Sequence, residues 1–255
     1  MKKFCFTVDD NIRFFQILST GNAASLFSNP YLALYKRLHE KYQLKVQLNL
    51  FYEMPGFDLS QMTDRFQTEW AENARWLKLS FHSRLENVNP YLSSGYQEVY
   101  SDCAAVHQEI LRFAGEQSLG KTTTIHYCQT TEEGLRALRD HGVQGLLGLF
   151  GTDEAPRSSY SLPEPDAALL RKGEILHRHG LDFCSIDLVM NLYDREELLR
   201  RLRALLDRNA LRVMIHEQYF YSDYHAYQPD FGEKLDQAFG LLRKNGYESC
   251  FAEEL

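Results

Sequence analysis

The chain has 255 residues, of which 44% are hydrophobic and 25% charged, and this balance is typical of a globular protein with a full core. Its formal net charge is −7, and residues 199–208 form its only basic run, which argues against nucleic acid or an anionic membrane as a partner. We therefore expect a small molecule or another protein as the partner, and a single domain over residues 1–255.

The cysteines and the first residues bear on the cellular compartment. Five scattered cysteines without a CxxC pair suggest neither a disulfide framework nor a cysteine zinc site. The chain reaches charged residues before an apolar run could form the core of a signal peptide, and no apolar stretch is long enough to span a membrane. The sequence therefore predicts a cytoplasmic protein with reduced thiols.

Short β-rich runs alternate with segments of helical apolar spacing along the chain. The candidate strands are residues 3–8, 44–52, 76–82, 122–128, 143–150, 181–190 and 211–218, with a short eighth candidate at 247–252. Strict alternation of strand and helix predicts a parallel sheet, and no GxGxxG motif follows any strand. At this length we predict an α/β fold, a single (β/α) barrel of seven or eight parallel strands.

The connections between the strands carry helix and loop signals. Residues 31–42 and 194–208 each show an apolar stripe at helical spacing. Thr130 and Glu133 predict a capping box at the start of a further helix. Residues 151–166 form the one long loop, whose length and turn residues fit a lid and a solvated insertion equally well.

Polar and apolar residues alternate within several of the strands. We expect the polar set to point into the barrel and the apolar set to face the helices; the polar set includes Asn49, Ser80 and Thr124, and the apolar set Leu48, Leu79 and Ile125. Polar groups inside a barrel must bond to each other, to water or to a ligand. The pattern therefore indicates a wet pocket, and the alternative is a narrow core whose polar groups satisfy one another.

Ionisable side chains stand at the carboxyl ends of most predicted strands. They are Asp9, Asp10, Glu53, His82, His126, Asp187, His216 and Glu217. In a parallel barrel these ends share one rim, where active sites are built. Aspartate, glutamate and histidine together are ligands for a divalent cation, and a cation also relieves the repulsion between adjacent carboxylates. The rim therefore predicts a metal or acid/base site.

The stretch "FTVDDN" resembles the TFDDG motif of the polysaccharide deacetylase superfamily (carbohydrate esterase family 4), whose barrel begins with a strand ending in an aspartate pair. The resemblance implies a deacetylase-like barrel in which Asp9 is the catalytic base and Asp10 a metal ligand. From the residue alone, Asp9 could instead cap the turn that begins at Asn11.

Later segments resemble further motifs of that family. "HSRLE" is similar to H(S/T)xxH, with His82 matching and Glu86 replacing the second histidine. "MIHE" resembles the late leucine-x-histidine motif and makes His216 the implied general acid. Asp187, in "SIDLVMN", stands where the family has the aspartate that orients this machinery. The arginine-proline motif is missing, and His126 stands in the corresponding segment.

The resemblance therefore implies a metal-dependent hydrolase of C–N bonds. Its divalent ion, zinc first among zinc, nickel, cobalt and manganese, would be held by Asp10, His82 and Glu86. Should Glu86 point to solvent, His126 or His216 would replace it. Because the chain shows no export signal, a small N-acylated sugar or amide is the expected substrate.

Five further residues are candidates for substrate binding: Glu53, Arg84, His126, Tyr219 and Tyr221. Aromatic rings at a barrel rim can stack on a sugar, although packing of this connection on the barrel explains them equally well. Arg84 could bind an anionic group of the substrate or form an outward salt bridge.

Two other functions are consistent with the same residues. A metal-dependent sugar isomerase or lyase would use rim residues Glu53, His82, His126, Asp187 and Glu217. A diverged barrel that binds a carbohydrate or metabolite without turnover would explain the altered second motif and the missing arginine.

Overall fold

The computed structural model describes residues 2–86 and 91–255. The strands are β1 (Lys2–Asn11), β2 (Val46–Met54), β3 (Phe57–Asp58), β4 (Leu77–Leu85), β5 (Thr122–Thr123), β6 (Gly145–Gly148), β7 (Leu176–Arg178), β8 (Leu181–Ser185), β9 (Leu188–Val189), β10 (Ala210–His216) and β11 (Tyr247–Cys250). The helices are α1 (Arg13–Thr20), α2 (Pro30–Tyr42), α3 (Gln67–Asn73), α4 (Tyr96–Phe113), α5 (Glu132–Asp140), α6 (Glu164–Arg171), α7 (Arg195–Ala204) and α8 (Phe231–Lys244).

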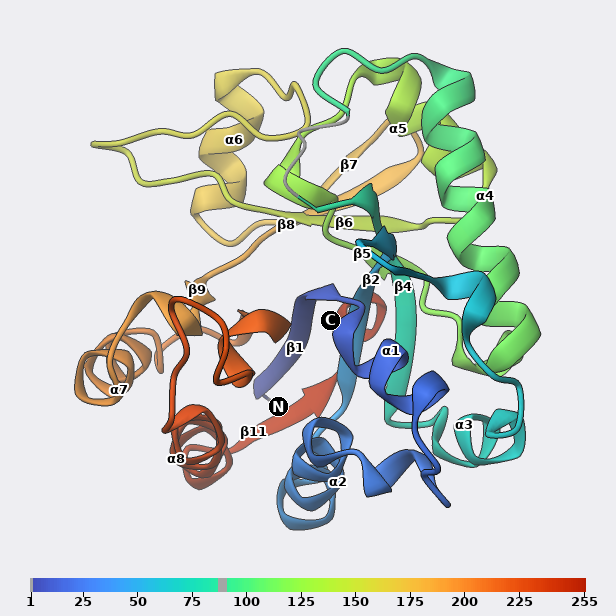
Figure 1. Cartoon of the computed structure of the whole chain (residues 1–255). Helices are drawn as coiled ribbons and strands as arrows, with labels where there is room; N and C mark the ends of the chain where they lie inside the picture. Colours follow the sequence, from blue (N-terminus) through green and yellow to red (C-terminus); the bar gives the residue numbers. More distant parts are fainter. Residues whose placement is uncertain (1, 87–90) are drawn as a thin grey trace.

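The parallel strands lie in two sheets, with helices around the outside (Figure 1). In one sheet β1 pairs with β2, β10 and β11, and β2 pairs with β4; in the other, β6 pairs with β5 and β8. Two links connect the sheets. The Gly120 amide donates to the Leu79 carbonyl at 2.8 Å, and β8 continues into β9, which pairs with β10. The predicted (β/α) barrel fold is confirmed, and the short eighth candidate is β11.

Successive side chains along a strand point alternately into the barrel and toward the helices. In β1, Phe4 and Phe6 belong to the main core and pack on Phe239 of α8, with ring centroids 5.7 and 4.9 Å apart. Cys5, between them, belongs to a smaller cluster. In β2, Asn49 is buried and accepts a hydrogen bond from Gln47, whereas the neighbouring Leu48 lies in the main core. The buried polar groups therefore line the inside of the barrel, as expected for β2.

The predicted strand at 122–128 is wrong beyond its first residues. Strand β5 ends at Thr123, and residues 126–128 form a helical turn with φ of 59° at Tyr127 and 55° at Cys128. A left-handed backbone cannot continue an extended strand, so the expected alternation of faces stops there. As a result, the side chain of Tyr127 is exposed rather than packed on a helix.

The predicted helices at 31–42 and 194–208 are present as α2 and α7. Helix α2 begins where the Asn29 side chain accepts from the Tyr31 amide at 3.0 Å, and Pro30 occupies its first position. The predicted cap of α5 is one residue off, because Thr131 rather than Thr130 accepts from the Gly134 amide.

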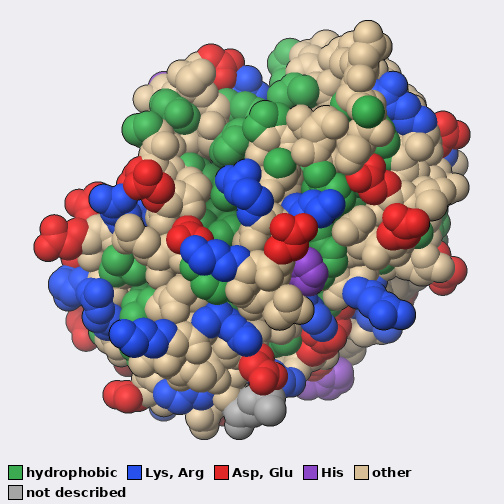
Figure 2. Space-filling view, turned by 90° about the horizontal axis from the view of Figure 1, so that it is seen from below, with side chains coloured by type: hydrophobic (Ala, Val, Ile, Leu, Met, Phe, Trp, Pro, Cys, Tyr) green, Lys and Arg blue, Asp and Glu red, His purple; other side chains and the backbone are tan. Residues whose placement is uncertain are grey.

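Charged side chains of both signs lie on the surface. Over the face drawn in Figure 2, Lys and Arg side chains lie interspersed with Asp and Glu. Among the described residues, no helix is long and apolar enough to cross a membrane. The five cysteines are buried and unpaired.

Candidate metal centre and active site

The aspartate pair ends β1 at an irregularity in the sheet. The register between β1 and β2 shifts between Val8 and Asn11, and Asp10 has a φ of 64°. In a regular strand, neighbouring side chains point to opposite faces. The left-handed residue interrupts this alternation, and aspartate tolerates that conformation better than most residues. Asp9 and Asp10, both buried, therefore line the same pocket.

Three side chains from three segments meet at this point. Asp10 Oδ1 lies 3.0 Å from His82 Nε2 and 3.4 Å from His126 Nδ1, and the two histidine nitrogens are 3.1 Å apart. Ligand bonds of about 2.0–2.1 Å would place neighbouring tetrahedral donor atoms roughly 3.3 Å apart. The spacing of these atoms therefore fits a common ion.

The hydrogen bonds of His82 determine which of its nitrogens carries a proton. His82 Nδ1 contacts the Thr124 carbonyl oxygen, which can only accept, so Nδ1 is the donor. Burial lowers the pKa of His82 despite the nearby Asp10 carboxylate, so the ring is neutral near pH 7. Its Nε2 then presents a lone pair to the oxygen of Asp10. A proton or a cation between Nε2 and Oδ1 satisfies both atoms, and a divalent metal is one cation that fits this donor pair.

The two aspartates differ in their surroundings. Burial would raise the pKa of Asp10, but hydrogen bonds with His126 and His82 hold it well below the usual range. Burial and the neighbouring Asp10 raise the pKa of Asp9 well above its ordinary value, although a hydrogen bond from Asn49 opposes this. Of the two carboxyl groups, Asp10 therefore favours the ionised form more than Asp9 does.

Neighbouring amides and a further histidine complete the site. Asn49 Nδ2 donates to Asp9 Oδ1 at 2.7 Å, and Gln218 Nε2 donates to Asp10 Oδ2 at 2.6 Å. His216 Nδ1 lies 2.8 Å from Asn191 Oδ1, and with Nδ1 as the donor the ring leaves Nε2 free for chemistry. The roles of Gln218 and Asn191 were missed from sequence; the position of Gln218 just beyond the end of β10 was the available signal.

The pocket around these groups has a volume of about 390 Å³. Its lining includes His216, Thr124, Leu149, Leu192, Tyr219, Tyr224 and Arg157 in addition to the metal-site residues. Arg157 reaches the pocket from the long loop, and its guanidinium donates to the Tyr127 carbonyl at 3.2 Å. The loop thus contributes a cation to the pocket wall.

Glu86 lines the same pocket but does not belong to the three-residue group. Burial and the negative charge of Asp10 raise the pKa of Glu86. The residue grouped with Asp10 and His82 is His126, which we named as a replacement ligand, and the donor atoms of these three lie within 4.8 Å of one another. The left-handed turn at Tyr127 and Cys128 shapes the segment that carries His126.

Other candidate residues lie away from the pocket lining. Glu53 and Arg84 pair with each other at 3.4 Å, and Arg84 also approaches Asp102. Asp187 contacts Arg208 and accepts from the Arg212 amide at 2.8 Å. Among the described residues, none of these three candidates lines the pocket, because each is held by a partner elsewhere.

Glu217 and Tyr221 serve the fold beside the site. Glu217 accepts from the Ile12, Arg13 and Phe14 amides at 2.6, 3.1 and 2.9 Å, which caps the start of α1. Tyr221 donates to the same carboxylate at 2.6 Å. Tyr219, by contrast, does line the pocket.

Comparisons with known proteins bear on the fold. No protein-family model matches the chain, and no curated protein matches its sequence. Among solved structures, a family 4 acetyl xylan esterase from Clostridium thermocellum in complex with a cobalt ion is 14% identical, with a TM-score of 0.53, over 99% of this chain and 89% of that one. A T48 deacetylase with substrate is 8% identical, with a TM-score of 0.52, over 99% and 89%.

A 4-α-glucanotransferase from Thermococcus litoralis is 12% identical, with a TM-score of 0.62; the match covers 99% of this chain but only 40% of that one. These likenesses support a deacetylase-like (β/α) barrel fold for the chain. The chain is thus similar in fold to a carbohydrate esterase of family 4, the group whose motif "FTVDDN" resembles.

Proposed function

We propose that this protein is a metal-dependent hydrolase that cleaves the C–N bond of an amide or N-acyl group. The observation that supports this most strongly is the convergence of Asp10 Oδ1, His82 Nε2 and His126 Nδ1 within 3.4 Å of one another in a buried pocket. The likeness in fold to a cobalt-bearing esterase is consistent with the same chemistry.

In this proposal Asp10, His82 and His126 hold one divalent ion, with zinc first and nickel, cobalt and manganese as alternatives. The chain supplies one carboxylate and two imidazoles, which leaves a coordination position open. The bound ion would supply a water of lowered pKa and polarise the carbonyl of the substrate.

Asp9 and His216 handle protons in this scheme. Asp9 lies beside Asp10 in the pocket lining, and its raised pKa suits a group that accepts the proton of the attacking water. Asn49 holds the Asp9 carboxylate through one oxygen. Asn191 orients His216 through Nδ1, so that Nε2 is the atom that delivers a proton to the departing amine.

We infer a small substrate of the N-acylated sugar or amide class. A pocket of about 390 Å³ matches the range in which proteins bind small molecules. The Tyr219 and Tyr224 rings can stack on a sugar, and Arg157 can pair with an anionic group.

The isomerase alternative depends on residues that the pocket lining lacks. Among the described residues, Glu53, Asp187 and Glu217 are not part of that lining, and each is bound to another partner. Hydrolysis is therefore the function that the arrangement supports best.

A matched pair of variants tests this proposal. The purified protein is analysed for metal and assayed on a panel of N-acetylated amino sugars and small amides, before and after chelation. We expect His126→Gln to lose one equivalent of metal and the chelator-sensitive activity, because a ligand is gone. Glu86→Gln, the control, should keep the metal. The proposal fails if His126→Gln retains full metal content and activity, or if Glu86→Gln alone loses them.

A further inference from the structure

A second group of potential metal ligands lies outside the barrel, between two helices. Cys103 and His107 belong to α4, and His141 directly follows α5. Cys103 Sγ lies 3.7 Å from His107 Nε2 and 3.9 Å from His107 Nδ1, and His107 Nδ1 lies 3.1 Å from His141 Nδ1. The barrel metal site shares none of these residues.

The local sequence brings these three side chains to the contact between α4 and the end of α5. Cys103 and His107 are four residues apart, so they lie one above the other on the same face of α4. Helices α4 and α5 lie side by side (Figure 1). Helix α5 ends at Asp140, so His141 leaves it on the side of α4, where the rings of Tyr100 and His141 are 5.0 Å apart.

The donor set and its spacing match a zinc-type ion. Thiolate and imidazole are the ligands that zinc prefers, with bonds of about 2.3 Å to sulfur and 2.0–2.1 Å to nitrogen. Such bonds set tetrahedral donor atoms roughly 3.3 to 3.6 Å apart. In the structure, one atom from each of the three residues lies within 4.8 Å of the other two, so small side-chain rotations would complete the set.

The burial of the three residues also fits such a site. Cys103 and His107 are buried, whereas His141 is half-buried. The half-buried side can admit water as a fourth ligand.

We propose that Cys103, His107 and His141 form a second metal site, for a zinc-class ion, that fastens α4 to the end of α5. This site is structural: it lies apart from the pocket and is not needed for hydrolysis. Binding requires the Cys103 thiol to give up its proton to solvent. Because a bound ion favours the folded state only, it also raises Tm.

Cobalt titration of the metal-free full-length protein tests the proposal. Co²⁺ bound to a thiolate gives a charge-transfer absorption that the Asp/His/His site cannot produce. We expect this band in the wild type and its loss in Cys103→Ser. We expect it to persist in His126→Gln, which alters only the barrel site. His141→Gln, at the half-buried position, should weaken cobalt binding at this band by at least about 100-fold.

Melting curves with zinc give a second reading that does not depend on cobalt. At a zinc concentration about 100 times the dissociation constant, Tm should rise by roughly 5 to 10 °C in the wild type and less in Cys103→Ser. The proposal is overturned if the wild type shows no thiolate band, or if Cys103→Ser and His141→Gln both keep it unchanged. In that case His107 and His141 form only a neutral hydrogen bond beside a packed thiol.

Discussion

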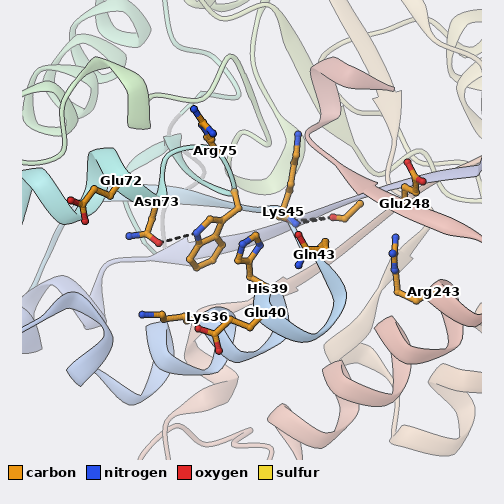
Figure 3. A pocket seen from close by; sticks show the side chains of 12 residues that line it. Lys36, His39, Glu40, Gln43, Lys45, Glu72, Asn73, Arg75, Arg243 and Glu248 are labelled. Atoms are coloured by element: carbon orange, nitrogen blue, oxygen red, sulfur yellow. Dashed lines mark hydrogen bonds between the residues drawn. The ribbon is translucent and has the colours of Figure 1, made fainter.

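At the carboxyl end of the barrel, Asp10, His82 and His126 are buried and face one another within 3.4 Å. At the amino end, a hollow of about 780 Å³ lies among α2, the start of β4 and β11, and Lys36, Glu40, Arg75, Arg243 and Glu248 stand around it (Figure 3). The amino-end hollow is the larger of the two. Its titratable groups are dispersed, whereas those of the rim converge on one point.

Several polar groups of the amino-end hollow bond to neighbouring parts of the fold. His39 Nδ1 lies 2.9 Å from the Leu44 carbonyl, and its ring stacks on Trp76 at 4.5 Å. Trp76 Nε1 donates to Asn73 at 2.9 Å (Figure 3). Within the described part of the chain, no group of ligand atoms meets in this hollow. The comparison teaches that convergence of buried ionisable groups, rather than volume, distinguishes a reactive site.

The largest effect on activity should come from changes in the aspartate pair. The two changes should also distinguish the roles of Asp9 and Asp10 within the rim. We expect Asp9→Asn to lower turnover by about 10² to 10⁴-fold while metal content stays the same, because only the general base is lost. Asp10→Asn should lose metal as well as activity. Metal analysis with steady-state kinetics checks this. A loss of metal in Asp9→Asn with none in Asp10→Asn would reverse the assigned roles.

A smaller effect concerns the stability of the rim at different pH values. Burial raises the pKa of Glu217 from 4.5 to about 7, although the Tyr221 hydroxyl and the α1 amides oppose the shift. Between these values the folded state binds more protons than the unfolded state, so the Glu217 contribution is greatest below about pH 4.5 and is lost as pH rises through about 7.

Glu217→Gln isolates this contribution. The stability advantage of the wild type over Glu217→Gln should fall by about 3 kcal/mol between pH 4.5 and 7, because one pKa unit corresponds to about 1.4 kcal/mol. Urea unfolding of both proteins across this range measures the difference. An advantage that grows with pH would show instead that the start of α1 keeps Glu217 ionised.

The smallest effect should come from the amino-end hollow. His39→Ala removes the hydrogen bond to the Leu44 carbonyl and the stacking on Trp76, so we expect a loss of about 1 to 2 kcal/mol in stability. Turnover should not change, because His39 lies at the opposite end of the barrel. A drop in turnover with folding intact would show that the amino-end hollow takes part in the reaction, which contradicts the difference drawn between the two ends of the barrel.

The sequence predicted the barrel because its signals are local. Strand and helix periods, the Asp9–Asp10 pair at the end of β1 and His82 within β4 are all readable along the chain. Glu86 was the expected third ligand because it follows His82 at the motif's spacing. His126 instead lies close to Asp10 and His82, on a segment with a left-handed turn at Tyr127 that no periodicity reveals.

Side-chain partners that lie far apart in the sequence explain why other candidate residues do not line the pocket. Arg84 and Glu53 stand near the ends of neighbouring strands, but they pair with each other away from the pocket lining. The register shift between β2 and β4 next to Phe51 is a long-range feature that spacing within one strand cannot show. The single domain over residues 1–255 stays a prediction.

The most direct test of the account is the anomalous diffraction of crystals grown with zinc. The account predicts an ion at the rim within about 2.0 to 2.2 Å of Asp10, His82 and His126. An empty rim, or an ion bound by Glu86 with His126 turned away, would contradict it.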